Sequence, residues 1–161
     1  MKICFRNAPR IGEPLTGQSL LPILRKAAEW YAVFLMGNRL SKNINIRVNF
    51  IDDLQRESNE GGNCIWEDDY IRPREFTIEL AKDATIEEVL TNFAHEMVHV
   101  KQWARGEIKD VMKAHSLCKW KGVEVNTDEI NYWDLPWEIE AHGREKGMYL
   151  RFCEYAGITE V

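Results

Sequence analysis

The sequence predicts an α+β fold: an N-terminal helix, a small mixed or antiparallel sheet, a motif-bearing helix and a C-terminal helix. Three patterns predict it: helical spacing of apolar residues, period-two alternation in short segments, and a helix-capping sequence. The chain has 161 residues, the length of one ordinary domain. We therefore expect one domain over residues 1–161, with residues 1–15 as an irregular arm because Pro9, Gly12 and Pro14 interrupt it.

Residues 19–38 are expected to form the first helix. Their apolar residues recur at intervals of three, four and seven positions, which brings the side chains onto one helical face. Gly37 and Asn38 are typical stop residues for this helix. The apolar face comprises Leu20, Ile23, Leu24, Ala27, Tyr31, Phe34 and Leu35.

The sheet is expected from segments that alternate apolar and polar residues. Residues 44–50 and 74–80 both alternate, as strands with one buried face do. Residues 64–66 are a shorter strand candidate. The acidic, glycine-ended segment 52–62 predicts a loop between them.

The second helix is expected to begin at Thr85 and to end near Gly106. Glu88 follows Thr85 by three positions and completes a capping box, in which each side chain caps a free backbone N–H of the first turn. An apolar stripe then runs along this helix through Ile86, Val89, Leu90, Phe93, Met97 and Val100.

The C-terminal third ends in a helix expected over residues 137–155. Pro136 stands where a first helical turn tolerates proline. Before it, residues 120–125 fit either a hairpin or a single strand, and residues 126–134 predict a loop.

Charge and hydropathy exclude some classes of protein. The net charge of −5 argues against a general nucleic-acid-binding protein, which usually carries a basic excess. No apolar run reaches the 18 or so residues that span a membrane, and the first 14 residues do not form a signal peptide. The four cysteines are widely spaced and form no CxxC motif. We therefore expect a cytoplasmic protein with reduced thiols.

The motif that carries chemistry is His95-Glu96-Met97-Val98-His99, which matches HExxH and lies inside the second predicted helix. Residues four apart project from the same face of a helix, so both imidazoles can reach one metal ion. Glu96 is turned about 100° from His95 and can act as general base on a metal-activated water. The alternative is a solvent-facing helix surface with two incidental histidines. We expect one zinc ion per chain.

A catalytic zinc usually has three protein ligands, so one more is needed. Glu138 and His142 share one face of the last predicted helix, and Glu140 is expected to pair with Arg144 instead. Glu138 is therefore the preferred ligand, while His142, Glu140 and another group remain alternatives. His142 could also support a ligand from the second shell.

Other residues have two interpretations. Tyr132, His115 and His142 are candidates for stabilising an oxyanion, although a loop tyrosine is more often a packing residue. Five tryptophans surround the predicted site elements, either as core residues or as a base-stacking surface. They are Trp66, Trp103, Trp120, Trp133 and Trp137.

The HExxH motif followed by Glu138-Ile-Glu-Ala141 resembles the zincin metallopeptidases of the gluzincin type, whose third ligand is a glutamate. The resemblance implies a minimal zincin-like fold, His95, His99 and Glu138 as ligands, and Glu96 as the catalytic residue. The resemblance covers residues 75–103 best and residues 132–149 in part. His142 departs from the Asp or Asn often found at its position. A histidine third ligand would make the chain more similar to SprT-like proteases, whose usual cysteine-rich zinc ribbon is absent here.

The resemblance also implies a function and a mode of substrate binding. It implies a zinc metallopeptidase that hydrolyses a peptide or protein substrate. The strand before the motif helix, residues 74–80, would be an edge strand that pairs with extended peptide. Three alternatives remain: a catalytically weak zinc-binding sensor or interaction module, an SprT-like protease acting on nucleic-acid-bound proteins, and an acidic interaction protein that holds no metal.

Overall fold

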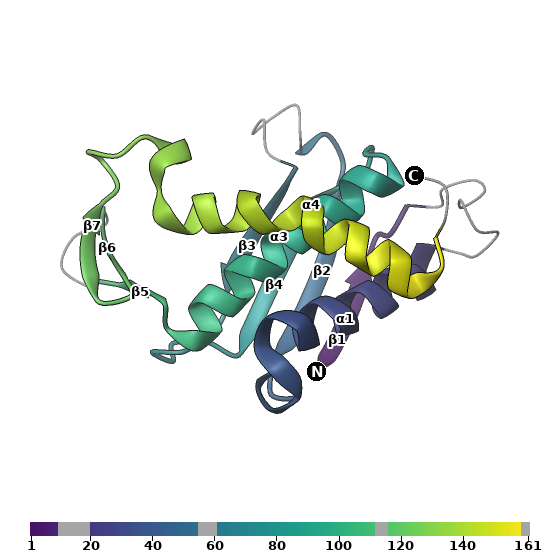
Figure 1. The fold of residues 1–161 in the computed structure, drawn as a ribbon, viewed down its shortest axis with the longest axis horizontal. Coiled ribbons are helices and arrows are strands. Elements are labelled where there is room, and N and C mark those ends of the chain that lie inside the picture. The colour runs from purple at the N-terminus through teal and green to yellow at the C-terminus, as the bar shows by residue number, and fades with distance from the viewer. Residues whose placement is uncertain (10–19, 55–60, 112–115, 159–161) are drawn as a thin grey trace.

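The computed structural model describes residues 1–9, 20–54, 61–111 and 116–158. Within them, helices α1 (Leu20–Ser41) and α3 (Ile86–Arg105) pack against one face of a sheet, and α4 (Pro136–Ala156) packs across both helices (Figure 1). A second, smaller sheet lies at one end of the molecule. The α+β class predicted from the sequence is confirmed.

The larger sheet contains β1 (Lys2–Arg6), β2 (Asn45–Ile51), β3 (Gly62–Trp66) and β4 (Glu75–Ala81). Its described strands lie in the order β1-β2-β4-β3. The first three are mutually parallel, whereas β3 runs antiparallel to β4 at the edge. The sheet is therefore mixed, and its one antiparallel strand is an edge strand.

Two expectations about this sheet are wrong. Residues 2–6 form a strand parallel to β2, although residues 1–15 are expected to be irregular; residues 10–15 lie outside the described residues. Ile3 and Phe5 pack against the core, and the Phe5 ring meets the Phe93 ring edge-on at 6.3 Å. The strand before the motif helix, β4, is also interior, because both β2 and β3 pair with it.

Helix α3 begins and ends at the predicted residues for the predicted reasons, whereas the predicted stop of α1 at Gly37 and Asn38 is wrong. The capping box at the start of α3 is present, with the Thr85 hydroxyl and the Glu88 side chain each bonded to the other residue's backbone N–H. Gly106 closes the helix in a left-handed conformation with φ of 69°. Helix α1 continues to Ser41 across a kink at Gly37, whose φ of 73° lies outside the helical range.

The main core lies between α1, α3, α4 and the larger sheet. Tyr31 is fully buried at its centre, and its hydroxyl donates a hydrogen bond to the Leu90 carbonyl at 3.2 Å. Its ring contacts those of Phe93 and Phe152, so one α1 side chain touches both other helices. This packing fixes the angle at which α4 crosses α3.

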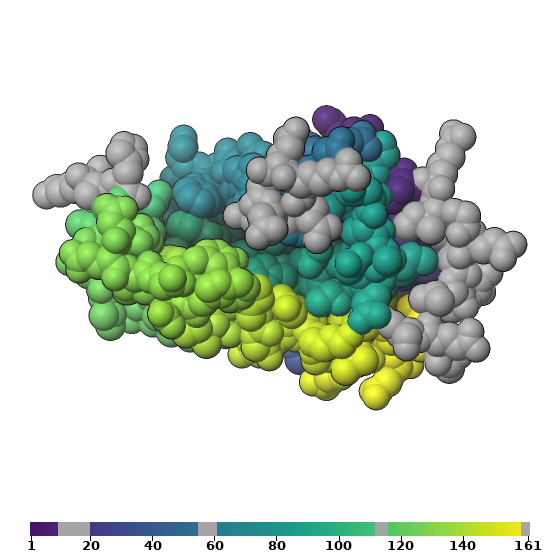
Figure 2. Space-filling view, turned by 90° about the horizontal axis from the view of Figure 1, so that it is seen from above, coloured from purple at the N-terminus to yellow at the C-terminus, as the bar shows by residue number. Residues whose placement is uncertain are grey.

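The smaller sheet contains β5 (Ile108–Asp110), β6 (Leu117–Trp120) and β7 (Val123–Asn126). The β6–β7 hairpin decides between the two interpretations of residues 120–125, and the predicted loop over 126–134 contains a short 3-10 turn, η1 (Tyr132–Asp134). Figure 2 shows this green region at one end of the molecule, continuous with α4. Residues 55–60 of the predicted loop 52–62 lie outside the described part, and Gly62 already belongs to β3. No helix in the described ranges is long and apolar enough to cross a membrane.

Candidate metal centre

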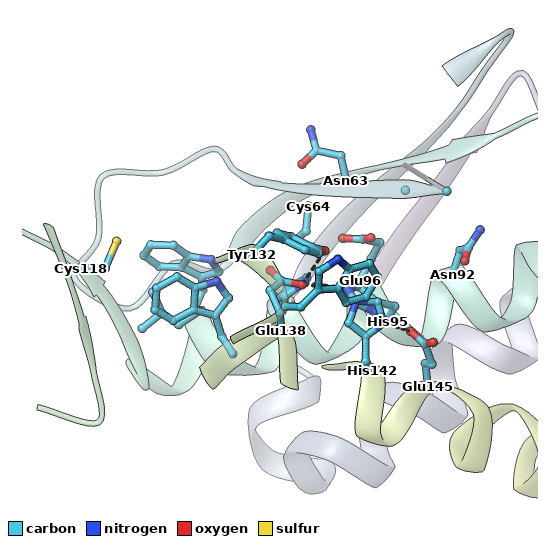
Figure 3. Close-up of a pocket in the computed structure, with 17 residues that line it drawn as sticks. Asn63, Cys64, Asn92, His95, Glu96, Cys118, Tyr132, Glu138, His142 and Glu145 are labelled. Atoms are coloured by element: carbon cyan, nitrogen blue, oxygen red, sulfur yellow. Dashed lines mark hydrogen bonds and ion pairs between the residues drawn. The ribbon is translucent and has the colours of Figure 1, made fainter. Parts of the chain in front are cut away.

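The polar side chains of the HExxH segment of α3 line a cavity of about 530 Å³ together with residues of β3 and α4. His95 and Glu96 are only 8% and 4% exposed. The solvent-facing alternative for this stripe is therefore wrong. Helix α3 provides the two histidines, α4 provides Glu138, and β3 forms the opposite wall of the cavity (Figure 3).

Three potential ligand atoms converge in the cavity. The Nε2 atoms of His95 and His99 lie 3.0 Å apart. Glu138 Oε2 lies 3.4 Å from the first and 3.5 Å from the second. These atoms form a nearly equilateral triangle, with spacings close to the roughly 3.4 Å expected between tetrahedral zinc ligands at bond lengths of about 2.0–2.1 Å. Glu140 is not part of the triangle.

The outer nitrogen of each imidazole has an acceptor. His95 Nδ1 lies 2.6 Å from Glu145 Oε2, and His99 Nδ1 lies 2.8 Å from the side-chain oxygen of Gln102. The Gln102 amide nitrogen donates to the Trp137 carbonyl at 2.9 Å, which leaves its oxygen facing His99. Both Nδ1 atoms are therefore donors, and both Nε2 atoms direct lone pairs into the triangle when the rings are neutral.

The electrostatics of the triangle require positive charge. Burial opposes the charged form of His95, but hydrogen bonds to Glu138 and Glu145 and the charge of Glu96 outweigh it and raise the His95 pKa to about 10. Burial likewise opposes ionisation of Glu138, yet its hydrogen bonds with His95, His99 and Tyr132 hold its pKa well below its usual range. A divalent cation would meet the same requirement while leaving both rings neutral.

Zinc fits this donor set. Two imidazole nitrogens and one carboxylate oxygen are the ligands of one common class of catalytic zinc site. Each imidazole has an oriented outer partner, as zinc-bound histidines almost always do. Glu138 also lies in the first turn of α4, where the helix dipole favours a carboxylate.

Glu96 lies beside the triangle, on the side of β3 (Figure 3). A Cβ added to Gly62 would lie 2.8 Å from Glu96 Oε1 and 3.1 Å from the Glu79 carbonyl oxygen. A Cβ on Gly61 would meet the Asn92 side chain. Two glycines therefore allow the edge strand to approach α3 at the carboxylate that the sequence predicts to be the base.

The remaining candidates have distinct positions. The Tyr132 hydroxyl donates to Glu138 Oε2 at 2.8 Å. His142 lies against His95, with ring centroids 4.5 Å apart, and its Nδ1 is 3.3 Å from Glu145 Oε2. Its Nε2 is buried and has no hydrogen-bond partner among the described residues. His142 thus belongs to a second possible group, His95, His142 and Glu145, rather than to the triangle. His115 lies outside the described residues.

Glu140 turns away from the triangle into an ion-pair network. It accepts hydrogen bonds from Lys101 at 2.8 Å and from Arg144 at 3.1 Å, and the predicted pairing with Arg144 is confirmed. Lys101 is 5% exposed and also contacts Glu107 at 2.6 Å. The network joins α3 to α4 at Lys101 and Glu140, which stand two positions beyond His99 and Glu138 in the sequence.

Sequence reasoning did not identify Glu145. The signal was available, because Glu138, His142 and Glu145 stand at positions i, i+4 and i+7 of one helix and therefore share a face. The importance of Gly62 could not be predicted from the sequence either. It depends on the close approach of β3 to Glu96, which leaves no room for a side chain at position 62.

Comparisons with known proteins do not identify a family for this chain. No protein-family model, no curated protein and no solved structure matches the chain. The cavity and its side chains are therefore the features from which a function can be inferred.

Proposed function

We propose that this protein is a zinc-dependent metallopeptidase in which His95, His99 and Glu138 hold one zinc ion and Glu96 is the general base. The observation that carries the proposal is the convergence of two Nε2 atoms and one carboxylate oxygen within 3.0–3.5 Å, with both Nδ1 atoms held from outside. A coincidental pair of helical histidines would not require matching acceptors on both outer nitrogens.

Within this site the carboxylate of Glu96 is placed to move a proton. A zinc ion, when bound, supplies Lewis acidity that brings the pKa of water towards 7 and polarises a carbonyl group. Glu96 would take a proton from the attacking water and pass it to the leaving amine. Its burial at 4% exposure and the close packing of Gly62 fix the carboxylate in a single position.

The edge strand β3 supports a peptide substrate. The Ala81 amide donates to the Gly61 carbonyl, and the Glu67 amide donates to the Glu75 carbonyl. In an antiparallel pair, alternate residues direct both backbone groups at the partner strand. Odd-numbered residues of β3 therefore face β4, and Gly62, Cys64 and Trp66 direct their backbone groups towards the open edge. An extended peptide could pair with these groups along the cavity.

His142 is better placed than Tyr132 to meet an oxyanion, and the third candidate, His115, lies outside the described residues. Its Nε2 is buried without a partner among the described residues, and the residue lines the cavity. The Tyr132 hydroxyl is already hydrogen-bonded to Glu138. Because His142 Nδ1 faces the Glu145 carboxylate, only the doubly protonated ring has an Nε2–H, and in that form we assign it to the developing oxyanion. We assign Tyr132 to the orientation of Glu138.

The proposed location is the cytoplasm. The four cysteines are unpaired in the structure, as expected for a protein that works in a reducing compartment. Peptides or proteins are the proposed partners. The acidic net charge gives no support to nucleic acid as a partner.

The first test is metal content. Purified wild type should hold one zinc per chain by mass spectrometry, Glu138→Ala should lose or weaken it, and His142→Ala should retain it. Loss in His142→Ala with retention in Glu138→Ala would move the ligand assignment to His142. Absence of zinc from wild type, even after zinc is added, would refute the enzyme.

The second test is hydrolysis of an unstructured protein such as casein. Glu96→Gln should keep its zinc and lose activity by at least about a hundredfold, the scale of general-base catalysis. A biological effect that survives this substitution would favour the sensor alternative. Steeply salt-dependent DNA affinity would favour the protease of nucleic-acid-bound proteins.

A further inference from the structure

One end of the cavity is apolar. Four of its lining residues form what we call the tryptophan wall: Trp103, Ile108, Cys118 and Trp137. The Trp103 ring packs against the Trp66 ring at a tilt of 31° with centroids 4.0 Å apart, and Trp66, outside the cavity lining, is 38% exposed. Within the wall, Trp103 and Cys118 are partly exposed, whereas Ile108 and Trp137 are buried, so the wall is an apolar surface at the edge of the core that still lines the cavity.

The smaller sheet supports this wall. Ile108, Trp137, Val125 and Leu135 form a separate buried cluster, which Trp103, Cys118 and Trp120 extend. Trp120 also contacts Trp137, with ring centroids 6.4 Å apart. No step of the proposed hydrolysis uses this sheet, but it holds the wall rigid beside the zinc ligands.

The wall lies along the path of the edge strand. Strand β3 and helix α3 run side by side in the same direction: Gly61 meets Asn92, Gly62 meets Glu96, and Trp66 meets Trp103. The five steps from Gly61 to Trp66 and the eleven from Asn92 to Trp103 both cover roughly 16 Å. The proposed zinc ligands fall between a polar end near Asn92 and the tryptophan wall (Figure 3).

The charged side chains of the cavity disfavour an acidic ligand group at positions away from the proposed zinc ion. Its lining includes the carboxylates of Glu96, Glu138 and Glu145. Among the described residues, no lysine or arginine lines it. Away from the proposed zinc ion, a substrate carboxylate from a side chain or a chain terminus would meet repulsion and no cationic side chain.

We propose that the tryptophan wall binds a large apolar side chain next to the scissile bond, in an internal peptide segment without acidic residues at that point. This inference rests on the proposed peptidase function and deepens it by naming the substrate class. Backbone pairing with β3 does not depend on the sequence of the peptide, so the tryptophan wall is the feature that would distinguish one substrate side chain from another. Rigid aromatic rings bury an apolar side chain without losing rotamer freedom of their own.

The test measures binding, so that it does not depend on turnover. Zinc-loaded Glu96→Gln is titrated calorimetrically with acetylated and amidated octapeptides of one neutral sequence that carry Phe, Leu, Ala or Glu at a single central position. The Phe and Leu peptides should bind at least about tenfold more tightly than the Ala peptide. The Glu peptide should bind more weakly than the Phe, Leu and Ala peptides. A shortened Ala peptide that ends at the central residue with a free carboxylate should also bind more weakly than the full Ala peptide.

Two further substitutions, each made in the Glu96→Gln variant, test whether the tryptophan wall causes the preference for apolar side chains. Trp103→Ala removes one of its rings, and Cys118→Phe fills the space beside it. Both should lower the ratio of Phe to Ala affinity, with zinc content and circular dichroism unchanged. Tyr70→Ala and Cys4→Phe are matched controls at exposed positions outside the cavity lining, and should leave the ratio as it is.

The outcomes separate the inference from the function. Equal affinities, preference for the Glu peptide, or no binding would each overturn the tryptophan wall as the selecting feature, even if wild type hydrolyses casein. An apolar preference lost in both wall variants would establish the site. If wild type then hydrolysed none of the four peptides and no casein, the peptidase function would fail while the apolar binding site stood.

Discussion

The carboxylate of Glu145 lies 2.6 Å from Nδ1 of His95, on the side of the ring opposite the proposed zinc ligands. This contact fixes the tautomer in which Nε2 is available for a metal, and it strengthens that nitrogen as a donor. Glu145, which the sequence analysis did not identify, therefore orients His95, one of the proposed zinc ligands.

Glu145→Ala should weaken zinc binding about 10- to 100-fold, the usual range for outer partners of zinc-bound histidines. Competition with a chromophoric chelator measures the affinity. Glu154→Ala, an exposed acid farther along α4, is the matched control and should have no effect. Unchanged affinity in Glu145→Ala would show that this hydrogen bond does not tune the metal site.

Gly62→Ala should reduce hydrolysis about 100-fold while the bound zinc stays in place. The new methyl group would lie within 3 Å of Glu96 Oε1, so the proposed base must move, and displacements of about 1 Å can cost that much. Steady-state rates and zinc content are measured on the same preparation. Zinc loss alongside the fall in rate would point to a general distortion of the site.

Gly147→Ala should stabilise the protein by about 0.5–1 kcal/mol, because glycine in a helix interior costs that much relative to alanine. Gly147 lies inside α4, and its added Cβ would meet no atom within 4 Å. Urea unfolding followed by circular dichroism measures the change. The same variant is a glycine control for Gly62→Ala, since its peptidase activity should equal that of wild type.

Glu140→Gln should lower the free energy of unfolding by roughly 3 kcal/mol at pH 7, because it removes one member of a buried ion-pair network. Although burial opposes ionisation, hydrogen bonds from Lys101 and Gln102 and the charges of Lys101 and Arg144 lower the Glu140 pKa to about 2. A folded-state pKa below the unfolded value of 4.5 contributes stability that is complete above pH 4.5 and is lost as pH falls towards 2.

The difference between wild type and Glu140→Gln should therefore narrow as pH falls through this window. Denaturant titrations at pH 7, 5, 4 and 3 measure it. A constant difference across all four would contradict the charge-based explanation and leave only a packing effect.

Local signals explain which parts of the fold could be predicted. The capping box at Thr85, the αL glycine at Gly106 and the alternation of β2 and β4 all act within a few residues, so the sequence reveals them. The order β1-β2-β4-β3 depends on contacts across the whole chain and could not be derived in this way. Strand β1 was not predicted because its alternation of Ile3 and Phe5 is short and two prolines follow it closely.

In the candidate site, too, local spacing could be predicted from the sequence, whereas contacts between elements could not. Helical spacing alone places His95 and His99 together, and it correctly separates Glu138 from Glu140. It could not choose between Glu138 and His142, because both stand on one face of α4 and only the packing of α4 on α3 decides which one reaches the histidines.

The triangle of ligand atoms also joins distant parts of the chain. His99 and Glu138 stand on helices separated by the whole smaller sheet, and a metal ion between them would close that stretch into a loop, as a cross-link does. Metal binding would then add directly to the free energy of folding. Cellular zinc supply would thus set how long each copy of the protein survives, as well as whether it can act.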